Sequence, residues 1–312
     1  MSNNTKNKCS VIIPVYQAEK HLPFTIDSCL SQEEYIKEII LVDDFSTDDS
    51  FEILLQYQKN YPDIIKPFRN IEKGGNNARN YGFSLSSGDY IQWLDADDTI
   101  IHGKLKAQIS FLEANAEIDI AYSGWQLVES IDNNVLIYSQ LNPTVEYADY
   151  LFELIRGNWL PPHAYLLKRN IALLLADIKA WDPVTRICQD WEYFTKAAIQ
   201  GARFGNVTGI YSIYYRRLNE ISVSRSISSE GRARESIRLL SQLLDEIDTQ
   251  TWIEEKNKNK YNKLLLGQIL RNSLWYNLPF NLKNDFMSNI DWSAIKGVNT
   301  KLKKMNELIE QL

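Results

Sequence analysis

A short apolar run that ends in three carboxylates constrains this chain more than any other feature. Residues 90–94 are rich in aromatic and β-branched side chains and follow a Gly-Asp pair, which is the pattern of a buried strand. Asp95, Asp97 and Asp98 come directly after it. Carboxylates this close repel one another, and each loses hydration if it is even partly buried. A divalent cation would relieve both costs, and carboxylates two residues apart can supply its oxygen ligands.

The same residues also have a simpler explanation. Residues 95–98 could form a solvated turn that caps the next helix, and an Asp-x-Asp pair alone is a weak signal. A second acidic strand end favours the cation site. Residues 36–42 form another apolar run, and Asp43 follows it. The carboxyl ends of strands in an α/β sheet meet at one edge, where ligands bind.

Strands alternate with helices over the first 122 residues. The expected strands are residues 11–16, 36–42, 64–68, 90–94 and 118–122. Apolar residues at spacings of three and four predict helices between them. Ser46 with Asp49 resembles a capping box, and Gly88 is expected to end the third helix as a left-handed cap. This alternation predicts an α/β fold with a mostly parallel, doubly wound central sheet and flanking helices.

The rest of the chain is less regular. Helices are expected at residues 145–155, 171–178 and 190–200, and a strand at 207–217. From about residue 230, amphipathic helices predominate, including a last Lys- and Leu-rich segment at 302–312. We expect a first domain of residues 1–225, divided near residue 105, and a C-terminal helical region of residues 226–312.

Composition limits the function. The net charge of −6 argues against a broad surface for nucleic acid. The cysteines are few and widely separated, which suggests neither a disulfide framework nor a zinc site and fits a reducing compartment; they are Cys9, Cys29 and Cys188. No run approaches about 18 consecutive apolar residues, and the first eight residues lack an apolar signal core. We therefore expect a cytoplasmic protein.

Three polar residues have both a structural and a chemical explanation. Asp43 could cap a turn, or accept hydrogen bonds from a nucleobase or a ribose hydroxyl. Arg79 follows a glycine turn, where it could pair with a neighbouring acid or present its guanidinium fork to a diphosphate. Asp190 could cap its helix or act as a general base, with Trp191 beside it as a flat platform for a sugar ring.

Five ordered motifs together resemble family 2 glycosyltransferases, which are inverting enzymes with the GT-A fold. The resemblance extends from about residue 10 to 224, and the motifs are VIIPVY (11–16), LVDDFSTD (41–48), ARNYG (78–82), GDYI (88–91) and LDADD (94–98). Five motifs in this order identify a family far more specifically than an Asp-x-Asp pair alone. The resemblance implies a bacterial enzyme that takes a nucleoside diphosphate sugar, with a family preference for uridine, and uses Mn²⁺ or Mg²⁺.

The resemblance also implies roles for single residues. The residues implied to bind the donor are Pro14, Val15, Tyr16, Asp43, Arg79, Asp95, Ala96 and Asp97. Asp97 and Asp95 are implied as metal ligands, and Asp190 as the base, after a Gln where relatives usually carry Glu. For the acceptor, the residues suggested are Trp191, His163 and Asp98. His163 has a structural role as its alternative, and Trp125 and Trp159 are either core residues or sugar platforms.

Two departures from the family pattern matter. Residues 215–219 lack the histidine that many relatives carry near the diphosphate, so Arg216 or Arg217 is the candidate for neutralising phosphate there. The Gln-x-x-Arg-Trp sequence of processive synthases is missing, which favours addition of one sugar.

The resemblance therefore implies transfer of one sugar to a saccharide or lipid-linked acceptor in surface polysaccharide or glycolipid assembly. A nucleotidyltransferase and a non-catalytic nucleotide-sugar-binding scaffold are the alternatives. The C-terminal helices could close the acceptor site, form a homodimer or rest on the inner face of a membrane, although amphipathic stripes more often pack as core.

Overall fold

The computed structural model describes residues 9–131, 135–218 and 227–275. The chain divides into two compact units. The first contains Met1–Leu154 and Asn158–Ser222, and the second contains Ile155–Gly157 together with the chain from Val223 onward. The expected domain boundary at residue 225 stays a prediction.

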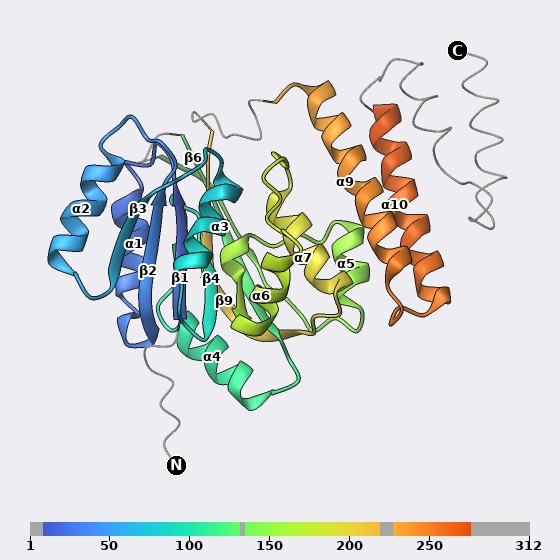
Figure 1. Cartoon of the computed structure of the whole chain (residues 1–312), viewed down its shortest axis with the longest axis horizontal. Helices are drawn as coiled ribbons and strands as arrows, with labels where there is room; N and C mark the ends of the chain where they lie inside the picture. The colour runs from blue at the N-terminus through green and yellow to red at the C-terminus, as the bar shows by residue number, and fades with distance from the viewer. Residues whose placement is uncertain (1–8, 132–134, 219–226, 276–312) are drawn as a thin grey trace. The chain divides into compact units, whose positions relative to one another are not determined.

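A mixed sheet forms the centre of the first unit (Figure 1). Its strand order is β3-β2-β1-β4-β8-β6-β9-β5, and β7 pairs with β6 beside this path. The strands are β1 (Cys9–Val15), β2 (Ile36–Asp43), β3 (Ile65–Arg69), β4 (Tyr90–Trp93), β5 (Thr99–Ile100), β6 (Ile120–Ile131), β7 (Val135–Asn142), β8 (Tyr165–Lys168) and β9 (Phe204–Arg217).

The sheet is parallel from β3 to β4 and mixed beyond. β8 runs antiparallel to both β4 and β6, whereas β9 runs parallel to β6. The first three strands run outward in the order β1, β2, β3, and β4 then pairs with the other side of β1. The chain therefore changes direction between β1 and β4, which is where open α/β sheets bind ligands.

Helices pack on both faces of this sheet. The helices of the first unit are α1 (Leu22–Leu30), α2 (Ser50–Asn60), α3 (Gly75–Leu85), α4 (Lys104–Ala114), α6 (Arg169–Asp177) and α7 (Gln189–Ile199), with 3₁₀ turns at Glu33–Tyr35 and Pro162–Ala164. α5 (Tyr150–Arg156) begins in the first unit, and its residues after Leu154 are assigned to the second. In the second unit, α9 (Ser229–Thr249) and α10 (Glu255–Trp275) lie side by side and bury Leu243 and Leu265. Among the described residues, no helix is long and apolar enough to span a membrane.

Side chains of β1 point alternately to the two faces of the sheet. Val11, Ile13 and Val15 belong to the core that also contains Leu22 and Leu105 of the helices α1 and α4. The opposite face packs against α3, which carries Arg79.

Gly82 sets how closely α3 approaches the sheet. A Cβ atom at this position would lie 2.7 Å from Cγ2 of Ile12 and 3.2 Å from Cγ2 of Val42. These contacts are closer than packed carbon atoms allow, so glycine is required for this approach.

The α/β fold expected from the sequence, with a central sheet and flanking helices, is confirmed, but some local expectations were wrong. α2 begins at Ser50, and the Ser46 hydroxyl instead accepts a hydrogen bond from Gln17 N, so there is no capping box at Ser46. α3 ends at Leu85 with Ser86 extended, and Gly88 N donates to Ser10 Oγ rather than ending the helix.

Other elements differ in extent. The expected helix at 145–155 is the shorter α5, and the irregular segment before it contains the unexpected hairpin of β6 and β7. The expected segment 302–312 lies outside the described residues.

We expect Gly82→Ala to lower the free energy of unfolding by about 1–3 kcal/mol, because the added methyl group forces α3 away from the sheet. Urea unfolding followed by circular dichroism measures the change. The matched control is Gly267→Ala in α10, where a Cβ meets nothing within 4 Å. That variant should gain about 0.5–1 kcal/mol from lower chain entropy. Equal effects of the two substitutions would contradict the packing argument.

Candidate active site

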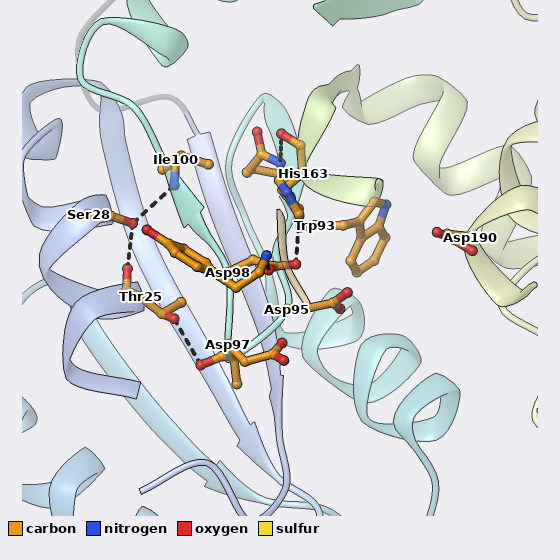
Figure 2. Close-up of polar contacts among 12 residues, drawn as sticks. Thr25, Ser28, Trp93, Asp95, Asp97, Asp98, Ile100, His163 and Asp190 are labelled. Atoms are coloured by element: carbon orange, nitrogen blue, oxygen red, sulfur yellow. Dashed lines mark hydrogen bonds and ion pairs between the residues drawn. The ribbon is translucent and has the colours of Figure 1, made fainter. Parts of the chain in front are cut away.

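The three acidic residues form a turn at the carboxyl end of β4. Asp98 N donates to Asp95 O at 3.2 Å, and the carbonyl of the buried Ala96 accepts a hydrogen bond from Thr25 Oγ1 at 2.9 Å. In Figure 2, Asp95 and Asp97 project to the same side, whereas Asp98 turns toward His163. The turn therefore separates two accessible carboxylates from one buried carboxylate.

Asp95 pairs with the guanidinium of Arg79, whose Nη2 lies 2.7 Å from Asp95 Oδ1. The Nη1 atom of this buried arginine donates to Asn76 Oδ1 at 3.1 Å and to Gln189 Oε1 at 3.4 Å. Its guanidinium carbon lies 4.5 Å from the ring centre of Trp181. These contacts hold the fork rigidly beside the acidic turn.

Asp97 is the more exposed of the two accessible carboxylates, with 49% of its side chain exposed. Arg217 lies beside it: Nη1 is 3.3 Å from Asp97 Oδ2, and Nη2 donates to the Asp97 carbonyl at 3.0 Å. Arg216 pairs with Glu129 instead. Of the two arginines that the sequence left open, Arg217 is the one whose contacts bring it to the acidic turn.

Asp98 is buried and ties the turn to β9, because its Oδ1 accepts a hydrogen bond from Tyr215 N at 2.8 Å. Its Oδ2 lies 3.4 Å from Nδ1 of the buried His163 (Figure 2). Burial and the charges of Asp97 and Asp95 raise the pKa of Asp98 well above its ordinary value. Burial lowers the pKa of His163 to about 3. Both side chains therefore favour their uncharged forms.

His163 and Asp98 thus form a buried pair behind the turn. Their suggested contact with an acceptor stays a prediction, and the geometry gives them a structural function that requires no exposure.

Asp43 is buried at the end of β2 and has one oxygen still to satisfy. Its Oδ2 pairs with Arg69 Nη1 at 2.8 Å, but its buried Oδ1 has no hydrogen-bond partner in the described residues. A buried carboxylate oxygen without a donor costs free energy. The neighbouring Asp44 is already occupied, because it accepts hydrogen bonds from Gly74 N at 2.8 and 3.0 Å. Asp43 Oδ1 is therefore suited to accept a ligand N–H or O–H.

The loop after β1 lies beside Asp43. Val15 is in register with Asp43 in the parallel sheet, and Val15 O accepts a hydrogen bond from Asp44 N at 2.7 Å. Pro14 is partly exposed, and Tyr16 is 47% exposed with Lys73 Nζ 5.4 Å from its ring centre. The first loop therefore offers an aromatic surface next to an unsatisfied carboxylate.

Asp190 lies in the first turn of α7, whose N-cap Cys188 adopts a left-handed conformation with φ 52°. The indole N–H of Trp159 donates to Asp190 Oδ2, and Trp191 N donates to Oδ1 at 2.9 Å. Burial is the largest influence on its carboxyl group and raises the pKa to about 6. The two hydrogen bonds favour the charged form and oppose this increase.

Charged residues of the acidic turn and of α3 also influence the pKa of Asp190. The charge of Asp95 raises the pKa of Asp190, whereas Arg79 lowers it. In Figure 2, Asp95 extends toward the side on which Asp190 lies. Trp191 is partly exposed, and its indole N–H donates to Leu154 O at 2.7 Å.

Asp95 and Asp97 have the chemistry of a hard-cation site. In the described residues, no group of three or more His, Cys, Asp or Glu side chains could hold a metal ion. Mg²⁺ and similar ions, however, commonly take one or two protein carboxylates and complete their coordination with substrate phosphate and water. The two accessible carboxylates fit that pattern when a diphosphate is bound.

Sequence reasoning missed the residues that hold the site together. Trp159 was considered only as a platform or core residue, although it donates to Asp190 across 31 residues of chain. Gln189, noted only as a replacement for Glu, contacts Arg79. For Tyr214, the sequence indicated only that it lies in a strand-like segment, and nothing in the pattern pointed to the site. No local periodicity connects such residues, because the contacts arise only when β9, α7 and the loop before residue 160 meet.

We expect Trp159→Phe to raise the pKa of Asp190 further above about 6, because the variant lacks the N–H that stabilises the carboxylate. NMR measures this titration through the ¹³Cγ chemical shift of Asp190. The pH range is about 4–9, which covers the carboxyl transition. The control is Trp191→Phe, because the Trp191 indole donates to Leu154 O and its backbone N–H remains. An unchanged titration in Trp159→Phe would contradict this role.

Known proteins resemble this chain in sequence and in fold. The family model described as "Glycosyl transferase family 2" matches residues 10–157. The poly(ribitol-phosphate) beta-glucosyltransferase of Bacillus spizizenii is 32% identical over 213 residues, which are 67% of this chain but 32% of that protein. An uncharacterized glycosyltransferase of Haemophilus influenzae is 29% identical over 235 residues, covering 70% of this chain and 91% of that protein. This chain therefore spans about a third of the first relative and most of the second.

Solved structures show the same fold. S. aureus TarS residues 1–349 in complex with UDP-GlcNAc has a TM-score of 0.63 at 19% identity, covering 92% of this chain and 77% of that chain. A mannosyltransferase from Pyrobaculum calidifontis in complex with GDP-Man and Mn²⁺ has a TM-score of 0.56 at 14% identity, covering 98% and 81%. With its matching family model, its named relatives and its GT-A-like fold, this chain belongs to glycosyltransferase family 2.

Proposed function

We propose that this chain transfers one sugar from a nucleoside diphosphate sugar, with UDP-sugars favoured, to an acceptor hydroxyl with inversion of the anomeric carbon. The observation that carries the proposal is that the carboxylates of this site lie in two different environments. Asp95 and Asp97 are accessible carboxylates beside arginines, whereas Asp190 has a pKa of about 6. Carboxylates with such different surroundings suit different tasks in one reaction.

The nucleoside binds at the ends of β1 and β2 in this proposal. Asp43 Oδ1 accepts the N–H of the base, which supplies the hydrogen bond that this buried oxygen lacks. Pro14, Val15 and the exposed ring of Tyr16 lie against the base. Asp95 accepts from the ribose, and Ala96 lines the turn. The UDP-GlcNAc complex of TarS supports uridine as the base, since that protein shares this fold.

The diphosphate binds beside the acidic turn. Arg79 is fixed by three neighbours and supplies positive charge where the leaving group develops negative charge. Arg217 lies beside Asp97 and is positioned to approach the phosphates. Asp97 and Asp95 would hold Mn²⁺ or Mg²⁺, which would stabilise the charge on the leaving diphosphate.

Asp190 acts as the general base. It takes the proton from the acceptor hydroxyl as that oxygen attacks the anomeric carbon in line with the departing diphosphate. Hydrogen bonds from Trp159 and Trp191 N keep its carboxylate oriented toward this task. Because the base must be ionised, the rate should fall as pH drops below about 6 and level off above it.

The names of the relatives and the sequence pattern support a biological setting for this reaction. The Bacillus spizizenii relative is named for transfer to poly(ribitol-phosphate), which supports a surface polymer or a lipid-linked glycan as acceptor. Trp191, which is partly exposed, keeps its suggested acceptor role within this proposal. The buried His163 and Asp98 act on the acceptor only by holding the acidic turn in place. We place the enzyme in the cytoplasm or at the inner face of the membrane. We assign transfer to residues 1–225, and membrane contact or homodimer formation to residues 226–312.

A product assay tests the proposal directly. The purified chain is given UDP-, GDP- and dTDP-sugars with Mn²⁺, with Mg²⁺ or with EDTA, and released phosphates are separated. Release of a nucleoside diphosphate that needs the metal supports glycosyl transfer. Release of pyrophosphate identifies a nucleotidyltransferase, and binding without any release identifies a non-catalytic scaffold.

We expect Asp190→Asn to lower kcat by about 10²–10⁴-fold, because the amide cannot accept the acceptor's proton. Calorimetric titration of UDP with Mn²⁺ should give an unchanged Kd, since this residue does not contact the nucleotide in the proposal. Asp177→Asn, at the end of α6, is the matched control. Wild-type turnover in Asp190→Asn would refute the assignment.

Asp43→Ala should weaken UDP binding by about 10–100-fold, which corresponds to the loss of a hydrogen bond to a charged group, about 1.5–3 kcal/mol. Calorimetry measures this change. Asp63→Ala, which removes an exposed carboxylate between α2 and β3, should leave the Kd unchanged. If both variants bind UDP as the wild type does, the nucleobase does not bind at Asp43.

A further inference from the structure

Three aromatic rings from distant parts of the first unit meet beside Asp190. Trp125 comes from β6, Tyr214 from β9, and Trp159 from the loop between α5 and the 3₁₀ turn at Pro162–Ala164. Their ring centres are 5.5 Å (Trp125–Trp159), 5.6 Å (Trp159–Tyr214) and 6.1 Å (Trp125–Tyr214) apart. The planes meet at 78–81°. We call these three residues the aromatic trio.

The trio has connections both to Asp190 and to the acidic turn. Trp159 donates directly to Asp190. Burial and the charges of Asp98, Asp97, Asp95 and Asp190 raise the pKa of Tyr214, so its phenol group is within electrostatic reach of the acids at both ends of the site. Tyr214 is also one residue before Tyr215, whose N–H anchors Asp98. The trio is therefore connected to Asp190 through Trp159 and to the acidic turn through the β9 backbone next to Tyr214.

The rings are not enclosed in the core. All three side chains remain partly exposed, in contrast to the fully buried Trp93 and Tyr165. Each edge-to-face contact engages the edge of one ring and a face of its neighbour, so the trio fixes the orientation of its members without covering every ring face. Rings held rigidly with exposed area suit a ligand that has its own flat apolar surface.

A pyranose ring has that surface. Its axial C–H groups form an apolar patch that packs on an aromatic face, while its hydroxyls bond to groups at the rim, here the carboxylate of Asp190 and the phenol of Tyr214. A linear polyol has no flat face, and it loses more conformational freedom when it is held. The chemistry of the trio thus favours a cyclic sugar over an extended chain.

We propose that Trp125, Trp159 and Tyr214 form the acceptor subsite, and that the acceptor unit placed against Asp190 is a pyranose ring rather than a linear polyol phosphate. This inference rests on the proposed function. It goes beyond it by stating the class of acceptor and the residues that select it. Trp125 contributes stacking alone, whereas Trp159 also holds the base.

Fluorine NMR tests the subsite without a need for the natural acceptor. The chain is labelled with 5-fluorotryptophan, and Trp125→Phe and Trp159→Phe assign the two signals. With UDP and Mn²⁺ present, methyl β-D-glucopyranoside, methyl β-D-galactopyranoside and D-ribitol 5-phosphate are titrated separately. We expect a pyranoside to shift both signals and ribitol phosphate to shift neither. Shifts with ribitol phosphate, or with none of the three probes, would overturn the proposal.

Kinetics supply a second test once an acceptor is turned over. Trp125→Leu should raise the acceptor KM by roughly 10-fold, because a stacking face is lost. Trp125→Tyr, which restores a ring, should recover most of this loss. The matched control is Tyr138→Leu, an exposed aromatic residue on the adjacent β7, which should keep the wild-type KM. A wild-type KM in Trp125→Leu would contradict the subsite.

The two proposals fail in different ways. If UDP does not bind and no nucleotide is released from any donor, the proposed function itself is wrong. Nucleoside diphosphate release with sugar transfer would support the proposed function. If, at the same time, ribitol phosphate or none of the probes shifts the tryptophan signals, or Trp125→Leu keeps the wild-type acceptor KM, only the acceptor subsite is wrong.

Discussion

Repulsion among the three carboxylates after β4 is the constraint on which this site depends. The structure relieves it by giving each carboxylate a different partner from a distant part of the chain. Arg79 of α3 pairs with Asp95, Arg217 of β9 lies against Asp97, and Asp98 accepts the N–H of Tyr215 within the interior. The acidic turn therefore holds its shape only when α3, β9 and β4 are all in place, so folding and site assembly are linked.

This arrangement gives the carboxylates of one site different properties. Asp98 favours its neutral form, Asp190 has a pKa of about 6, and Asp43 keeps one buried oxygen without a donor. Burial and the placement of neighbouring charges account for these differences, which no residue type carries by itself. In the proposed reaction, the same differences divide the work between nucleotide binding and proton removal.

Much of the donor half could be predicted from sequence. Residues 11–16, 36–42 and 90–94 are apolar runs with acids after two of them, and the rule that strand ends meet at one edge brings those acids together. The hairpin of β6 and β7 could not be predicted, because its polar residues, such as Gln126 and Glu129, hide the strand pattern. Burial of His163 and the hydrogen bond from Trp159 to Asp190 depend on tertiary packing alone.

The central claim is that nucleotide binds at the carboxyl ends of β1, β2 and β4. Hydrogen–deuterium exchange with mass spectrometry tests this most directly, with UDP and Mn²⁺ added to the purified chain. The account predicts slower exchange in peptides that contain residues 14–17, 43–46, 74–79 and 94–98, and little change in α9 and α10. UDP binding that leaves these four segments unprotected while protecting another part of the chain would contradict it.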